Sequence, residues 1–143
     1  MSQNLTINLQ ETPPSEDVDF VRERLREYNI SKVGDDDHHL TMGIFIRNPG
    51  GQILGGLLGD TYWGWLYVSI LWIDERLRGQ GYGEKLLAAA EQEAIRRGCS
   101  HAHLDTMSFQ AQPFYEKHGY TVYGVLEDQP TGHKKIYLQK KLT

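Results

Sequence analysis

Apolar and polar residues alternate, or recur at helical spacing, along most of this chain. The segment LTINLQ (5–10) alternates in the way that a half-buried strand does. The segment ETPPS then interrupts the pattern, and apolar residues between Val18 and Tyr28 recur at the spacing of one helix face. These patterns predict a first strand at 5–10 and an amphipathic helix over about 16–31.

The middle of the chain has the pattern of consecutive strands. A strand is predicted at 42–48, and the turn signal NPGG leads into a second hairpin arm, QILGGLLGDTYW. The segment GWLYVSILWID (64–74) is aromatic and β-branched throughout. This composition predicts a central strand that is buried on both faces.

The remaining chain alternates helices and strands. An apolar stripe from Leu86 to Ile95 predicts a helix that ends at Gly98. Further patterns predict a strand at 101–107, a short helix at 112–119, and strands at 120–127 and 134–142. The predicted fold class is therefore a mixed α/β layer with one strand–loop–helix–strand unit at its centre.

The loop of that unit, RGQGYG (78–83), is rich in glycine and opens a helix directly after a strand. The free backbone N–H groups of such a loop, together with the helix dipole, attract anions. Arg78 adds a charged donor for phosphate oxygens. A diphosphate is the ligand that this pattern favours.

Two other phosphate-binding patterns fit less well. A P-loop ends in Gly-Lys-Ser/Thr, whereas this loop ends in GEK. A dinucleotide fingerprint has the spacing G-x-G-x-x-G, and this loop has G-x-G-x-G. Asp105, at the end of the next strand, matches the ribose-binding acid of that fingerprint, so a dinucleotide-binding oxidoreductase stays an alternative.

The loop RGQGYG resembles the acyl-CoA pyrophosphate loop of the GNAT acetyltransferase superfamily. A second stretch, SFQAQPFYEKHGY (108–120), is similar to that family's Asn-x-x-Ala-x-x-Phe-Tyr-x-Lys-x-Gly-Phe/Tyr segment. The resemblance covers almost the whole chain and implies a single N-acetyltransferase domain over residues 1–143. It implies a mixed, mostly antiparallel sheet of six or seven strands with about four helices, and a splayed parallel strand pair at the cofactor site.

The resemblance also implies the site residues. Acetyl-CoA is the expected co-substrate, with no metal, and Tyr115 is the expected general acid. Ser108 stands where the family often has Asn, so its contact with coenzyme A is the family feature that this chain changes. The residues expected to bind the cofactor are Leu71, Trp72, Ile73, Arg78, Gly79, Gln80, Gly81, Tyr82, Gly83 and Ser108.

Tyr115 has a second interpretation, because helical spacing alone is more typical of a core aromatic beside Phe114, and it is the resemblance that favours the general acid. A phenol is neutral at pH 7 and its pKa of about 10 lies close to that of a thiol, about 8.5. The general base stays open. The candidates are Asp60, Asp74, Glu75, Glu127, Asp128, His38 and His39.

Composition and charge limit the classes of partner and the compartment that we expect for this protein. The 143-residue chain has a net charge of −4, which argues against a general nucleic-acid-binding protein. Neither a membrane-spanning run nor a secretory signal is visible, and Cys99 is the one cysteine, so we expect a cytoplasmic protein. We interpret Cys99 as a small buried residue.

For three further groups of residues, a structural interpretation is favoured over a functional one. The segment DDDHH (35–39) is typical of a solvated loop, although it is also placed to border an acceptor pocket. His101 and His103 share a strand face without a third metal ligand at a recognisable spacing. Trp63, Trp65 and Tyr67 alternate onto one face, which indicates packing, with an acceptor pocket or a dimer contact as alternatives.

The sequence therefore predicts an acyl-CoA-dependent N-acetyltransferase in which a primary amine attacks the bound thioester directly. A non-catalytic acyl-CoA-binding module is the alternative, since a fold does not fix a function. The acceptor is a small-molecule or peptide amine of unspecified identity. We expect neither nucleic acid nor a membrane as a partner. A homodimer is a further expectation.

Overall fold

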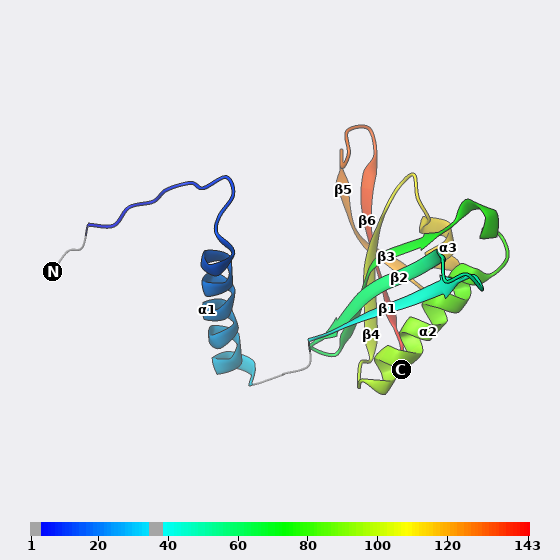
Figure 1. The fold of residues 1–143 in the computed structure, drawn as a ribbon, viewed down its shortest axis with the longest axis horizontal. Coiled ribbons are helices and arrows are strands. Elements are labelled where there is room, and N and C mark those ends of the chain that lie inside the picture. Colours follow the sequence, from blue (N-terminus) through cyan, green and yellow to red (C-terminus); the bar gives the residue numbers. More distant parts are fainter. Residues whose placement is uncertain (1–3, 35–38) are drawn as a thin grey trace. The chain divides into compact units, whose positions relative to one another are not determined.

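The structure, a computed structural model, describes residues 4–34 and 39–143 and divides into two compact units. The N-terminal unit ends at Asp37, and the larger unit covers His38–Thr143. A single domain over 1–143 stays a prediction. Figure 1 shows the elements of both units.

The N-terminal unit contains helix α1 (Ser15–Val33), which confirms the helix predicted there. Glu16 and Asp17 lie in its first turn, where carboxylates favour the helix dipole, and the helix ends at Gly34. The strand predicted at 5–10 is wrong, because the described part of this segment forms no strand. Alternation permits a strand, but a strand also needs a neighbour for its backbone hydrogen bonds, and all six strands of the sheet come from the larger unit.

A six-stranded sheet forms the larger unit, in the order β1-β2-β3-β4-β6-β5. All neighbours are antiparallel apart from β3 and β4, which are parallel. This arrangement confirms the predicted mixed, mostly antiparallel sheet. The strands are β1 (Leu40–Arg47), β2 (Ile53–Tyr62), β3 (Trp65–Ile73), β4 (His101–Met107), β5 (Thr121–Glu127) and β6 (Lys134–Lys141).

The core lies between the sheet and helix α2 (Tyr82–Arg96), which crosses one face of the strands (Figure 1). Four residues of the predicted apolar stripe form the buried face of α2: Leu86, Leu87, Ala90 and Ala94. Ile95, the fifth, is 42% exposed, so its place in the stripe was wrong. It packs against fully buried strand residues such as Leu57, Leu66 and Leu104. Burial of this apolar area supplies most of the driving force for folding.

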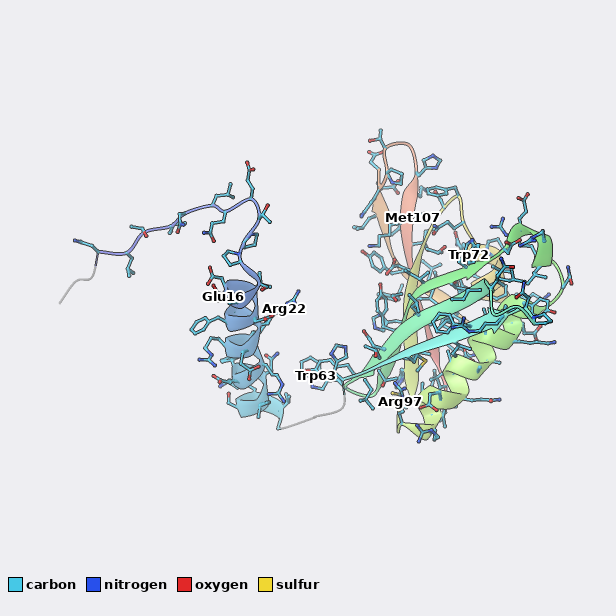
Figure 2. The ribbon with its side chains drawn as sticks, viewed as in Figure 1. Glu16, Arg22, Trp63, Trp72, Arg97 and Met107 are labelled. Atoms are coloured by element: carbon cyan, nitrogen blue, oxygen red, sulfur yellow. The ribbon has the colours of Figure 1, made fainter. Side chains whose placement is uncertain are left out.

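Arg97 (Figure 2), just beyond α2, joins the end of the helix to strands β1 and β2 at one edge of the sheet. Its guanidinium pairs with Glu93 at 2.8 Å and donates to the carbonyl of Leu40 at 3.1 Å and to the hydroxyl of Thr61 at 3.2 Å. The helix is therefore fixed at this end by charge-assisted hydrogen bonds as well as by packing.

Two short helices complete the unit. A 3₁₀ turn, η1 (Glu75–Leu77), follows β3, and α3 (Gln112–Lys117) follows β4. The described chain thus holds three α-helices and one 3₁₀ turn where about four helices were predicted. Among the described residues, no helix combines the length and apolar character that crossing a bilayer requires.

Candidate active site

Strands β3 and β4 pair only over their first halves. The parallel register runs from Trp65–His101 to Val68–Leu104 and then stops. At the same point β3 carries a bulge, because Val68 pairs with Gly59 and Ile70 with Leu58, which leaves Ser69 without a partner on β2. The predicted splayed parallel pair is present, and the β4-facing backbone of β3 beyond Val68 has no ladder partner on β4.

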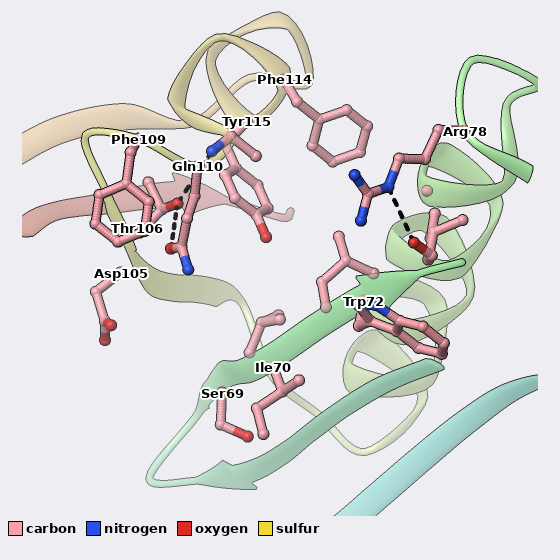
Figure 3. Close-up of a pocket in the computed structure, with 15 residues that line it drawn as sticks. Ser69, Ile70, Trp72, Arg78, Asp105, Thr106, Phe109, Gln110, Phe114 and Tyr115 are labelled. Carbon is pink, nitrogen blue, oxygen red and sulfur yellow. Dashed lines mark hydrogen bonds between the residues drawn. The ribbon is translucent and has the colours of Figure 1, made fainter. Parts of the chain in front are cut away.

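A cavity of about 670 Å³ lies between the separated strands (Figure 3). Its walls come from the second half of β3, the end of β4, the turn before α3, α3 itself and the start of α2. The lining residues are Val68, Ser69, Ile70, Leu71, Trp72, Ile73, Arg78, Gly83, Asp105, Thr106, Phe109, Gln110, Ala111, Phe114 and Tyr115.

The glycine loop leaves a row of backbone donors free. No described carbonyl or side chain accepts a hydrogen bond from the N–H groups of residues 79–84, and the first α2 bond here runs from Lys85 N–H to Gly81 at 3.2 Å. Gly79 and Gly81 have φ angles of 75° and 85°, which glycine adopts without strain. A loop of free N–H groups at a helix N-terminus fits a diphosphate.

Gly83 and Arg78 join this loop to the cavity. A Cβ at Gly83 would lie 3.2 Å from Phe114 Cζ and 3.3 Å from Ile73 Cδ1, so this glycine permits the close approach of α2 to α3 and β3. Arg78 Nε donates to the carbonyl of Ile73 at 3.1 Å, and Figure 3 shows the guanidinium at the cavity. The Arg78 guanidinium is therefore held between the glycine loop and the open edge of β3.

Tyr115 projects from α3 into the cavity (Figure 3). Its side chain is 6% exposed and packs edge-on against Phe114 and Tyr120. No hydrogen bond joins its hydroxyl to another described residue. Burial, and to a lesser extent the charge of Asp105, raises the pKa of Tyr115 to about 12, so the phenol keeps its proton at neutral pH.

The predicted binding residues divide into three groups. Leu71, Trp72, Ile73, Arg78 and Gly83 line the cavity, and the other loop residues, 79–82, supply the free N–H groups beside it. Ser108 lies outside the lining. Its hydroxyl accepts from the N–H of Lys134 at 2.9 Å and its own N–H donates to the carbonyl of Lys134 at 2.8 Å. Ser108 thus fastens β4 to β6, and its contact with coenzyme A stays a prediction.

The candidates for a general base lie elsewhere in the described structure. Asp74 is held by Arg76, whose hydrogen bonds lower its pKa to about 2. Asp60 and His39 line a separate hollow of the sheet, and Glu75, Glu127 and Asp128 line neither cavity. His38 lies outside the described residues. The geometry therefore brings none of these candidates into the cavity that holds Tyr115.

Comparison with known proteins agrees with this geometry. The model of the GNAT acetyltransferase family matches residues 5–120. Acetyltransferase Atu2258 of Agrobacterium fabrum is 40% identical over 133 residues, which are 93% of this chain and 96% of that protein. The chain belongs to the GNAT acetyltransferase family. This finding confirms the resemblance drawn from the glycine loop and the tyrosine segment.

Two further relatives agree with membership of the GNAT family. Blasticidin-S acetyltransferase of Streptomyces morookaense is 40% identical over 93 residues, which are 64% of this chain and 68% of that protein. The crystal structure of an acetyltransferase from Bacillus cereus shares 35% identity and superposes with a TM-score of 0.82 over 94% of this chain and 97% of its own. The prediction of an acetyltransferase is confirmed, and so is the predicted fold.

Sequence reasoning missed several residues of this GNAT cavity. Thr106 and Gln110 fix the turn before α3: the Thr106 hydroxyl donates to Gln110 Oε1 at 3.2 Å, and the same oxygen accepts from Met107 N–H at 2.8 Å. Phe109 and Phe114 supply apolar walls. The signal was available for Phe109, Gln110 and Phe114, because they belong to the segment after β4 that carries Tyr115, whereas Thr106 lies near the end of β4 itself.

Asp105 was noticed in the sequence only as a match to a ribose-binding acid, yet it lines the GNAT cavity. Its carboxylate accepts from the hydroxyl of Tyr67 at 2.9 Å and lies 3.9 Å from Lys135 Nζ. Burial together with that hydrogen bond raises the pKa of Tyr67 to about 12. Among the described lining residues, Asp105 is the one carboxylate.

Proposed function

We propose that this GNAT enzyme transfers an acetyl group from acetyl-CoA to a primary amine by direct attack within a ternary complex. The observation that carries the proposal is the meeting of three features at one cavity. These features are the open edge of β3, the free N–H groups of residues 79–84 and the unpartnered hydroxyl of Tyr115.

The chain's own groups fit the parts of acetyl-CoA. The amides of residues 79–84 and the guanidinium of Arg78 are donors for the diphosphate. The backbone groups of Leu71, Trp72 and Ile73 that have no partner on β4, apart from the Ile73 carbonyl held by Arg78, are available to the amides of the pantetheine arm. A backbone N–H aimed at the acetyl oxygen stabilises the charge that develops there, by roughly 3 kcal/mol.

The proposed reaction forms one bond and breaks another. The amine nitrogen attacks the thioester carbon, the new C–N bond forms, and the C–S bond breaks to leave a thiolate. The Tyr115 hydroxyl donates its proton to that sulfur. A pKa of about 12 makes Tyr115 a weak acid, but burial also disfavours a thiolate in the same cavity, which raises the proton affinity of the sulfur.

The amine must also lose a proton, and we assign Asp105 as the group that accepts it. It is the carboxylate that lines the cavity, and its charge acts on Tyr115. Cys99 is buried and does not line the cavity, which supports direct attack over an acyl-cysteine intermediate. The similarity to blasticidin-S acetyltransferase supports a small-molecule acceptor.

Release of free CoA in the presence of a panel of amines, blasticidin S included, tests the proposal. Tyr115→Phe should lower kcat by about a hundredfold or more, the usual contribution of a general acid. Acetyl-CoA at about a hundred times its Kd should stabilise the wild type and Tyr115→Phe alike, by about 2.7 kcal/mol.

Tyr123→Phe is the matched control, because it removes a hydroxyl from an exposed tyrosine of β5. An unchanged rate in Tyr115→Phe would exclude the tyrosine from the mechanism. Stabilisation by acetyl-CoA without acetylation of any amine would favour the acyl-CoA-binding module instead.

A further inference from the structure

A second hollow of about 330 Å³ lies on the sheet face that carries Trp65, Tyr67 and His103. Four of its seven lining residues are tyrosine or tryptophan, and the others are two histidines and one aspartate. The lining residues are His39, Asp60, Tyr62, Trp63, Trp65, Tyr67 and His103. Figure 2 shows Trp63 at the β2–β3 turn, at the opposite end of the hairpin from Trp72 of the acetyl-CoA cavity.

The aromatic walls of this hollow are held in place by one another. Tyr62 stacks on Trp63 with ring centroids 4.3 Å apart, and Tyr67 stacks on His103 at 4.8 Å. Trp65 meets the edge of His103 at 5.6 Å. The faces of such rings attract cations, and a preformed wall loses little conformational entropy when a ligand binds.

Asp60 gives the hollow a negative charge that its neighbours neutralise weakly. It pairs with Tyr67 across β2 and β3, and its ion partner is His39 Nε2 at 3.2 Å, a group that carries charge only when protonated. Other partly buried carboxylates have permanent cations: Glu93 binds two arginines and Glu91 binds Lys140 at 2.9 Å. In the described structure neither lysine nor arginine lines the hollow.

The hollow shares a wall with the acetyl-CoA cavity. Tyr67 lines the hollow, Asp105 lines the cavity, and the two side chains are joined by the 2.9 Å hydrogen bond from the Tyr67 hydroxyl. The charges of both Asp60 and Asp105 act on Tyr67 and on His103. One ligand that reaches across Tyr67 would therefore meet a carboxylate at each end.

We propose that this hollow binds a second cationic group of the acceptor. The inference rests on the proposed acetyl transfer and adds the substrate class to it: the acceptor carries an ammonium or guanidinium group besides the amine that reacts. The second group lies against Asp60 and the tryptophan and tyrosine rings, while the reacting amine lies on the Asp105 side of Tyr67.

Acceptors with and without the second cation test the inference. Agmatine and spermidine carry a further cationic group, whereas butylamine and hexylamine do not. We expect kcat/KM for the better of the first pair to exceed that of the second pair by about tenfold or more, the size of a desolvated cation–aromatic contact. Asp60→Asn should remove most of this preference and leave the KM for acetyl-CoA unchanged.

Glu127→Gln is the matched control, because it removes a carboxylate that is 70% exposed on the β5–β6 hairpin. Trp63→Leu, at a side chain that is 47% exposed, should reduce the preference without unfolding the core. Equal kcat/KM values for both classes of amine would overturn the inference. So would an Asp60→Asn variant that loses activity toward both classes to the same extent.

Binding separates a failure of this inference from a failure of the proposed function. Agmatine or spermidine should quench the fluorescence of the hollow's tryptophans in the wild type and not in Asp60→Asn. Quenching without acetylation of any amine would keep the hollow as a cation site and contradict the acetyl-transfer proposal. Acetylation without any preference for a second cation would do the reverse.

Discussion

The two halves of β3 have similar sequences and opposite environments. In the first half, Leu66 and Val68 are 0% and 3% exposed and lie under α2, and β4 completes the ladder. In the second half, Leu71 and Ile73 still pack against the core, but Ile70 and Trp72 are 53% and 47% exposed, and β4 no longer pairs with the strand. A similar apolar composition therefore forms core in the first half, and both a core contact and a cavity wall in the second.

This difference shows that the end of the β3–β4 ladder, rather than hydrophobicity, separates scaffold from site. The sequence predicted burial on both faces along all of residues 64–74, and this prediction is wrong for the second half. A β-branched or aromatic residue fits a strand whether its outer face meets a helix or a ligand. The splay frees backbone groups that the fold would otherwise use internally.

Truncation of one apolar residue in each half should give the largest contrast. Leu66→Ala leaves a cavity in the core and should lower the free energy of unfolding by about 3 kcal/mol, whereas Ile70→Ala should cost less than about 1 kcal/mol. Urea denaturation measures both. Equal losses would mean that the second half is as much a part of the core as the first.

The glycine opposite the bulge should give the next largest effect. A Cβ at Gly59 would lie 2.5 Å from the carbonyl oxygen of Tyr67, which is backbone and cannot rotate away. Gly59→Ala should therefore lower the free energy of unfolding by about 2 kcal/mol, because the two strands must separate at the point where the halves meet.

Gly124→Ala is the control for this substitution. The nearest contact of a Cβ there is an ordinary 3.7 Å, so its effect on unfolding should be close to zero. Equal stability of Gly59→Ala and Gly124→Ala would show that the bulge region is loosely packed, and would weaken the division of β3 into two rigid halves.

Most of the fold was predictable because its signals are local. The helices over 15–33 and 82–96 follow from apolar spacing, and the hairpin from NPGG. The strand predicted at 5–10 was wrong, because alternation does not reveal whether a pairing partner exists. The exact point at which β3 and β4 separate depends on a register that no local pattern encodes.

The site was predictable to a different extent. The glycine loop and Tyr115 have fixed spacing in the sequence, so the resemblance located them. Asp105 joins the cavity through tertiary structure, because its carboxylate accepts a hydrogen bond from Tyr67 of another strand. Its role depends on a neighbour that is distant in the sequence, whereas Gln110 fixes a turn through its near neighbours Thr106 and Met107.

Loss of the Arg78 guanidinium should affect the open half alone, because Arg78 is bonded to Ile73 at the end of that half. Arg78→Ala should raise the KM for acetyl-CoA by about tenfold, the usual cost of one charged hydrogen bond, with little change in stability. Arg96→Ala removes the same charge from the far end of α2 and is the control. Equal KM values in the two variants would exclude Arg78 from diphosphate binding.

The smallest effect concerns pH, and its sign follows from the burial of Tyr115 against the open half of β3. An ordinary tyrosine loses its proton near pH 10, whereas a pKa raised to about 12 keeps the phenol protonated well above that value. With saturating substrates, kcat should therefore change by less than about twofold between about pH 9 and about pH 10.5. Stopped assays of CoA release at each pH measure this directly. A fall in kcat centred near pH 10, absent from Tyr115→Phe, would mean that the phenol is hydrated, and the open half would then be a solvent channel rather than a closed reaction site.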